Sequence, residues 1–244
     1  MNRKDILWLY VYMTAGILDL SFIAQNLPHY RYFSKPIILL SLIIYFVKGS
    51  QLIRGSFLRK SVITALVFAL IGDVLLMFPH LFLYGLGAFL MTYICYNIAF
   101  ILGQRLSFNP SSFNFIRLFL YNLPIYLVAA VLYFLIHRQL GSIKIPIIIY
   151  LCAMVMLVTT ARLRFKKTND SSFWQVLIGS VLFFISQGIF LVDLFFQPLE
   201  EVDILMMGTY LLAQLLIVMG LRSHFLEVLV KVGRPKAEVR SQEK

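Results

Sequence analysis

The stretch Phe173–Phe196, FWQVLIGSVLFFISQGIFLVDLFF, is apolar along nearly its whole length and carries a single charged residue, Asp193. A helix needs about 20 mostly apolar residues to cross the hydrocarbon core of a bilayer, so this stretch predicts a transmembrane helix. Seven other segments share its character, although the second and third are short or charged near one end. The eight predicted spans cover residues 6–25, 33–48, 61–78, 81–103, 116–137, 144–163, 173–196 and 203–222.

The overall composition agrees with a membrane protein. Of the 244 residues, 60% are hydrophobic and 14% are charged, which leaves too few polar side chains to cover a soluble domain. We therefore expect one all-α transmembrane domain over residues 1–222, followed by a basic cytoplasmic tail over residues 223–244. The net charge is +11, but the basic residues lie in short segments between apolar runs. This pattern is typical of the basic loops that orient transmembrane helices, so we expect no nucleic-acid partner.

The distribution of lysine and arginine predicts the orientation of the helices. If the N-terminus is cytoplasmic, all but four of the 22 basic side chains lie in cytoplasmic segments. The four that lie outside are Arg31, Lys35, Arg138 and Lys144. Because cytoplasmic loops carry the excess of positive charge, both termini are predicted to be cytoplasmic, with the protein in the cell (inner) membrane.

A weak internal similarity suggests a parallel repeat of four helices. Three features of the first half recur in the second half at offsets of 110, 114 and 121 residues. The matched pairs are Pro36 with Pro146, Gly72-Asp73 with Ser186-Gln187, and Gly87 with Gly208. Such a unit, repeated once, gives two halves related by an axis along the membrane normal. The alternative is that apolar helices resemble one another by chance.

Three carboxyl groups lie inside apolar runs, at Asp19, Asp73 and Asp193. An ionised group in the bilayer costs roughly 2.5 kcal/mol or more, so such residues usually face the interior of the bundle or water. Asp73 has the deepest position of the three, and we interpret it as a proton donor or acceptor. The alternative is an aspartate that only hydrogen-bonds between packed helices. For Asp19 and Asp193, interfacial residues that reach headgroup water are an equal alternative.

Other polar side chains are expected at a depth similar to that of Asp73. Tyr93, Tyr96 and Asn97 lie with Phe89 on one face of the fourth predicted helix. Tyr210 and Gln214 form an i, i+4 pair in the eighth helix, and Ser186-Gln187 lies in the seventh. Their common depth predicts one cavity shared by four helices, whereas each pair taken alone is typical of packing.

The remaining candidates point to simpler roles. Lys35 precedes Pro36, and we expect it at the outer end of the second helix, with Pro36 in the first helical turn. Cys95 and Cys152 fall in apolar runs, and none of the four histidines has metal-ligand spacing. We therefore expect no metal and no cofactor.

These residues together resemble a known family. Lys35-Pro36, Gly72-Asp73, Gly85 with Phe89 and Tyr96, and Tyr210 with Gln214 follow the order and spacing of the YhhN/lysoplasmalogenase family of eight-helix membrane proteins. The resemblance implies hydrolysis of the vinyl-ether bond of lysoplasmalogens, which releases a fatty aldehyde from a glycerophospho headgroup. It implies a lysophospholipid substrate within the membrane lipids and Asp73 as general acid/base. The cavity would be lined by Lys35, Tyr93, Tyr96, Asn97, Ser186, Gln187, Tyr210 and Gln214.

Two positions differ from the family pattern. Tyr93 stands where the family usually has a histidine, and Gln187 stands where the family usually has a second aspartate after serine. A glutamine can position water, but it cannot exchange a proton at neutral pH. Two other functions therefore stay open, a non-catalytic lipid-binding or lipid-sensing relative and a small transporter. Two parallel repeats around a polar site also describe many carriers.

Overall fold

The computed structural model describes the backbone of residues 3–51, 55–105, 115–196 and 202–242. Within these ranges the chain forms eight α-helices and no strand, which confirms the all-α prediction. The helices are α1 (Arg3–Ala24), α2 (Pro28–Gly49), α3 (Phe57–Leu75), α4 (Phe82–Arg105), α5 (Phe115–Ile136), α6 (Lys144–Arg162), α7 (Asp170–Phe195) and α8 (Val202–Gln242). Each of them overlaps one of the eight predicted spans.

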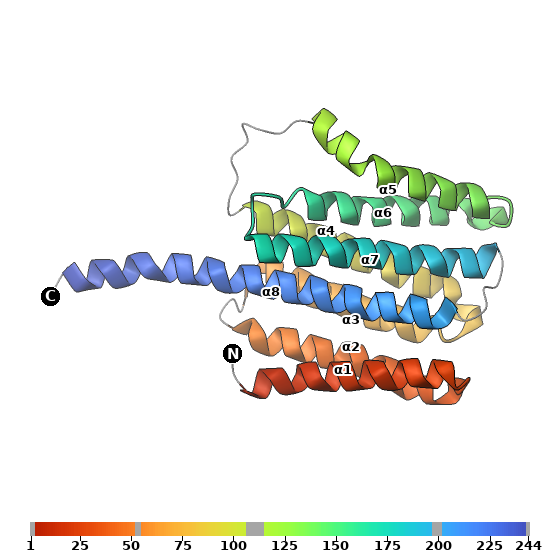
Figure 1. The fold of residues 1–244 in the computed structure, drawn as a ribbon, viewed down its shortest axis with the longest axis horizontal. Coiled ribbons are helices and arrows are strands. Elements are labelled where there is room, and N and C mark those ends of the chain that lie inside the picture. The colour runs from red at the N-terminus through yellow and green to blue at the C-terminus, as the bar shows by residue number, and fades with distance from the viewer. Residues whose placement is uncertain (1–2, 52–54, 106–114, 197–201, 243–244) are drawn as a thin grey trace.

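The helices have the length and composition of membrane spans. Seven of them are long and apolar enough to cross a bilayer. The eighth, α3, has a similar length but carries Arg59, Lys60 and Asp73, and it lies alongside the others in the bundle (Figure 1). Helices satisfy their own backbone hydrogen bonds, which is what the bilayer core demands of a spanning segment. The chain is therefore an all-α, multi-pass membrane protein.

The bundle has two distinct ends. Both termini lie at the same end, which we call the terminal end, and the other is called the opposite end (Figure 1). Helix α3 packs along α4, α7 packs along α8, and α6 lies against both α4 and α7. Helix α5 lies at the edge of the bundle beside α6, and α8 extends beyond the terminal end (Figure 1). Which end faces the cytoplasm, and whether the halves are a repeat, stay predictions.

Two helix boundaries differ from the sequence predictions. Helix α2 begins at Pro28, so Pro36 lies inside the helix rather than in its first turn. Pro28 takes the first-turn position instead, where a missing N–H costs no hydrogen bond. Helix α3 ends at Leu75, and the chain turns before Pro79. Asp73 therefore lies in the last turn of α3, nearer the opposite end than its place in the apolar run indicates.

Glycines allow α7 and α8 to approach each other closely. A Cβ atom placed on Gly179 of α7 would lie 2.9 Å from the carbonyl oxygen of Ala213 and 3.0 Å from the amide nitrogen of Ile217, both on α8. Contacts this short would force the two backbones apart. Small residues at helix crossings are the usual means of packing in membranes, where no hydrophobic force drives helices together.

We expect Gly179→Ala to destabilise the bundle by about 1–3 kcal/mol, because the added methyl group overpacks the contact between α7 and α8. The measurement is the midpoint of heat-induced aggregation of the purified protein in detergent. The matched control is Gly208→Ala on α8, where a Cβ atom would meet nothing within 4 Å. An equal midpoint for the two variants would contradict the close contact between α7 and α8 at Gly179.

Candidate functional site

Asp73 is joined directly to Tyr210. The Tyr210 hydroxyl on α8 donates a hydrogen bond to Oδ2 of Asp73 on α3, with an oxygen–oxygen distance of 2.9 Å. Both side chains are buried, with 7% of Asp73 and 4% of Tyr210 exposed. The two residues were both predicted as site residues, and the structure brings them together near the opposite end of the bundle.

Further charges surround this pair. Lys35 on α2 is close enough to Asp73 for their charges to interact. Asp19 on α1 accepts a hydrogen bond from the Ser34 hydroxyl, and the Nε of Arg31 lies 3.7 Å from Oδ1 of Asp19. We call Asp19, Arg31, Lys35 and Asp73 the charged cluster. It places two carboxyl groups and two cations where α1, α2 and α3 reach the opposite end of the bundle.

The burial of Asp19 differs from the interfacial position that was the alternative for this residue. Asp19 is completely buried, whereas Asp73 retains a small exposed fraction. Asp19 faces α2, where Ser34 and Arg31 contact it. Distance along an apolar run does not determine which face of a helix meets its neighbour, so the burial of Asp19 could not be deduced from the run alone. Asp193 is half-buried near the end of α7.

A second network contains Tyr93 and Gln187, which are linked through a residue that the sequence analysis missed. The Tyr150 hydroxyl on α6 donates to Oε1 of Gln187 at 2.5 Å, and it lies 3.3 Å from the Tyr93 hydroxyl. We call Tyr93, Tyr150 and Gln187 the tyrosine network. Tyr150 is the lone polar side chain in the stretch PIIIYLCAMVM from Pro146. That position in an apolar run was the signal that could have identified it.

The other predicted site residues hold helices together. The Tyr96 hydroxyl on α4 donates to Oε1 of Gln214 on α8 at 2.7 Å. The Ser186 hydroxyl on α7 donates to the carbonyl oxygen of Met206 on α8 at 2.8 Å.

Asn97 is held on both sides of its amide group. It donates to the carbonyl oxygen of Tyr93 one turn earlier on α4, at 2.9 Å. It also accepts a hydrogen bond from Thr160 on α6 at 2.5 Å. Because both the nitrogen and the oxygen of its amide group are hydrogen-bonded, Asn97 links α4 to α6 and has a structural role.

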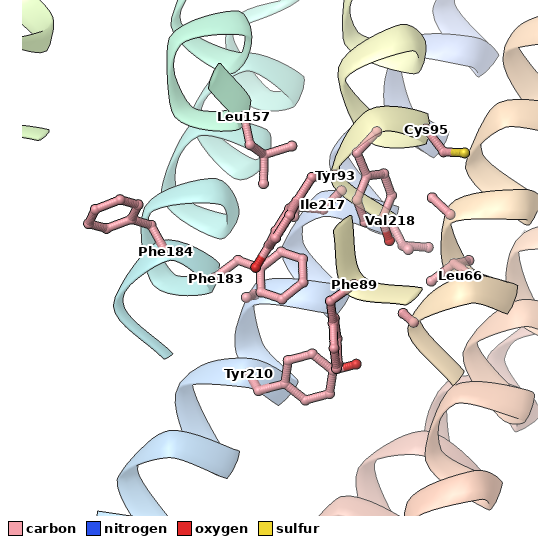
Figure 2. Packing of buried hydrophobic residues seen from close by; sticks show 14 of the residues in the cluster. Leu66, Phe89, Tyr93, Cys95, Leu157, Phe183, Phe184, Tyr210, Ile217 and Val218 are labelled. Carbon is pink, nitrogen blue, oxygen red and sulfur yellow. The ribbon is translucent and has the colours of Figure 1, made fainter. Parts of the chain in front are cut away.

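An aromatic layer separates Tyr210 from Tyr93 of the tyrosine network (Figure 2). The ring of Phe183 lies 5.1 Å from that of Tyr93 and 5.7 Å from that of Tyr210, measured between ring centroids. Phe89 packs edge-on against Tyr210 at 6.1 Å and against Phe183 at 6.3 Å. The sequence predicted one cavity shared by Asp73, Tyr93, Gln187 and Tyr210. The structure instead divides them between two hydrogen-bond networks.

A groove leads from the surface to the tyrosine network. It has a volume of about 240 Å³ and lies between the opposite-end halves of α4 and α6. Its lining is apolar apart from Tyr150, and it consists of Leu83, Leu86, Gly87, Leu90, Pro146, Ile147, Ile149 and Tyr150. A Cβ atom on Gly87 would meet nothing within 4 Å, so the glycine leaves part of this space open. The groove has the character of a site for an alkyl chain, and the Tyr150 hydroxyl is the polar group that such a chain would meet.

We expect Tyr150→Phe to destabilise the protein by about 1–3 kcal/mol, because buried Gln187 loses its hydrogen-bond donor and an unsatisfied buried acceptor is costly. The readout is the thermal midpoint in detergent, compared with Tyr84→Phe, which removes a hydroxyl from a side chain that is 70% exposed. A Tyr150→Phe midpoint equal to that of Tyr84→Phe would contradict the tyrosine network.

Comparison with known proteins identifies the family. No curated protein and no solved structure matches the chain. The sequence profile of the YhhN family matches residues 30–221, which is most of the chain. The matched region begins within α2 and ends within α8, so it contains Lys35, Asp73, Tyr210 and the whole tyrosine network. The chain belongs to the YhhN family.

Proposed function

We propose that the protein is a membrane-embedded hydrolase of vinyl-ether lysophospholipids, with Asp73 as its general acid. Membership of the YhhN family suggests a lysoplasmalogenase-like membrane protein. The observation that carries the proposal is the buried carboxyl group of Asp73, which is hydrogen-bonded to Tyr210 and interacts electrostatically with Lys35. A carboxyl group in an apolar bundle is costly, and such residues usually serve proton transfer or substrate binding.

The chemistry of a vinyl ether matches a single positioned acid. A proton added to the double-bond carbon that does not bear the ether oxygen gives an oxocarbenium ion. Water then attacks the carbon that is bonded to that oxygen. The resulting hemiacetal breaks into a fatty aldehyde and the glycerophospho alcohol. Protonated Asp73 would supply the first proton, and its carboxylate would take one back from the attacking water. One water is consumed and the acid is regenerated.

The two carboxyl groups of the charged cluster have different surroundings. Asp19 is completely buried and is bonded to Ser34 beside Arg31, which commits it to holding α1 against α2. Oδ2 of Asp19 has no hydrogen bond, but it is buried. On Asp73, Tyr210 bonds Oδ2 and the side chain keeps an exposed fraction, which leaves Oδ1 for a reacting group. Asp73 is therefore the better proton donor of the two.

Lys35 and Arg31 fit the headgroup of such a substrate. Both cations lie within electrostatic reach of Asp73. In a lysoplasmalogen, only the glycerol backbone separates the phosphate from the vinyl ether. A phosphate bound by these cations would thus place the ether bond next to the carboxyl group. Charge-assisted hydrogen bonds from lysine or arginine to phosphate are strong, so this contact would hold the substrate in register.

We expect Asp73→Asn to lower the rate of aldehyde release from lysoplasmalogen by about 10²–10⁴-fold, the usual contribution of a general acid. The assay uses purified protein in lipid nanodiscs and follows the aldehyde with a coupled dehydrogenase. Asp193→Asn is the matched control, because it removes a carboxyl group near the same end of the bundle but outside the charged cluster. Wild-type rates in the Asp73→Asn variant would disprove the role of Asp73.

A non-catalytic lipid-binding relative is the second candidate, and one observation favours it. Where the family usually has an aspartate and a histidine, this chain has Gln187 and Tyr93, and both belong to a neutral network around Tyr150. Neutral amide and phenol groups can bind lipid but exchange protons poorly at neutral pH. No such observation favours transport, because α4, α6 and α7 are continuous where they carry these residues.

The Gln187→Asp variant tests whether Asp73 acts without a second carboxyl group. For a hydrolase that works through Asp73 alone, we expect this variant to keep the wild-type rate of aldehyde release, because Phe89 and Phe183 separate position 187 from Asp73. Gln187→Asn is the control, since it keeps the amide group and adds no charge. Tight binding of lysoplasmalogen with no aldehyde from the wild-type protein would support the lipid-binding relative instead.

A further inference from the structure

A second and larger groove lies away from the charged cluster, between α5 and α6. It has a volume of about 570 Å³ and is lined by Tyr126, Ala129, Ala130, Tyr133, Ile148, Leu151, Cys152, Val155, Met156 and Thr159. Ala130, Cys152 and Met156 are exposed, so the groove opens on the outer surface of the bundle. α5 and α6 run side by side at the edge of the bundle (Figure 1), where that surface faces lipid. None of these residues belongs to the charged cluster or to the tyrosine network.

Two polar side chains at the terminal end of this groove have no hydrogen-bond partner. Asn122 lies one turn before Tyr126 on α5 and so shares its face. It is completely buried, and neither its nitrogen nor its oxygen is hydrogen-bonded. Arg162 follows Thr159 by three residues on α6, and its buried Nη1 has no hydrogen-bond partner. Arg162 is also near enough to Tyr126 to interact with it electrostatically.

The unpaired N–H groups of Asn122 and Arg162 match the hydrogen-bond acceptors of an oxyanion. An unsatisfied buried amide or guanidinium N–H costs about 1–3 kcal/mol, and burial within the protein keeps these atoms from water. A guanidinium group matches the geometry of phosphate oxygens, and an amide N–H can donate to the same group. Within the described residues, no carboxylate forms an ion pair with Arg162.

We propose that the groove between α5 and α6 binds one phospholipid of the surrounding bilayer, with its phosphate at Asn122 and Arg162 and one acyl chain along the groove. The lining residues of α6 extend from Ile148 to Thr159. At a rise of 1.5 Å per residue they span about 16 Å, close to half of the roughly 30 Å hydrocarbon core. The groove is thus as long as the chain region of one leaflet. This site does not depend on the proposed hydrolase activity.

The test measures phosphatidylglycerol bound to delipidated full-length protein by native mass spectrometry. We expect one tightly bound lipid on the wild type, and about tenfold weaker binding for Ala130→Trp, which fills the groove, and for Arg162→Gln. The matched controls are Val131→Trp, also exposed on α5 but outside the groove, and Arg138→Gln beyond the other end of α5. Controls and groove variants that bind alike would overturn the proposal.

Two further ligands identify the chemistry that is recognised. Diacylglycerol with the same chains lacks the phosphate, and inorganic phosphate lacks the chains. We expect each to bind about tenfold more weakly than phosphatidylglycerol or worse. Diacylglycerol binding as tightly as the phospholipid would rule out the contact with Arg162 and Asn122. Inorganic phosphate binding as tightly would rule out the groove as a chain site.

Cys152 provides a measurement that needs no change in the groove. Cys152 is exposed and lines the groove, whereas the other cysteine, Cys95, is buried. In a Cys95→Ala background, we expect bound phosphatidylglycerol to slow maleimide labelling of Cys152 by about tenfold, because the chain covers the thiol. Labelling that proceeds at the same rate with and without the lipid would overturn the proposal even if the groove variants failed to fold.

Discussion

The hydrogen bond from Tyr210 to Asp73 joins α8 to α3 inside an apolar bundle, where each polar group needs a partner within the protein. Because α3 packs along α4 and α8 packs along α7, this one contact ties the two closest helix pairs together. The same constraint explains the neighbouring contacts. Asp19 is paired with Ser34 and lies beside Arg31, and Lys35 interacts with Asp73. These four charged side chains thus form one cluster in which carboxyl groups and cations lie close to each other.

The aromatic layer determines which side chains can act together with the charged cluster. Phe89 and Phe183 lie between Tyr210 and the tyrosine network, so Asp73 acts apart from Gln187. A hydrolase built in this way relies on a single acid that both gives and recovers a proton. The groove beside Tyr150 and the groove between α5 and α6 are separate apolar spaces. The chain therefore offers two distinct places that suit apolar chains.

Much of the fold could be predicted from the sequence, because membrane thickness fixes the length of a spanning helix and apolar runs reveal it directly. Asp73 and Tyr210 could be selected as unusual polar residues, but their pairing depends on how α3 and α8 face each other. Tyr150 was missed because a lone tyrosine in an apolar run has the appearance of a packing residue. The burial of Asp19 depends on its contact with α2, and the larger groove depends on the placement of α5 against α6. Neither arrangement is encoded in the hydropathy of a single segment.

The most direct test of the account is hydrolysis of lysoplasmalogen by the purified protein in heavy water, with the aldehyde trapped at once by reduction. If a carboxyl group protonates the double bond, the product will carry one deuterium on the carbon next to the former carbonyl group. Free aldehyde incubated without protein shows the background exchange. Release of no aldehyde by protein that binds the lipid, or release of aldehyde without this deuterium, would contradict the account.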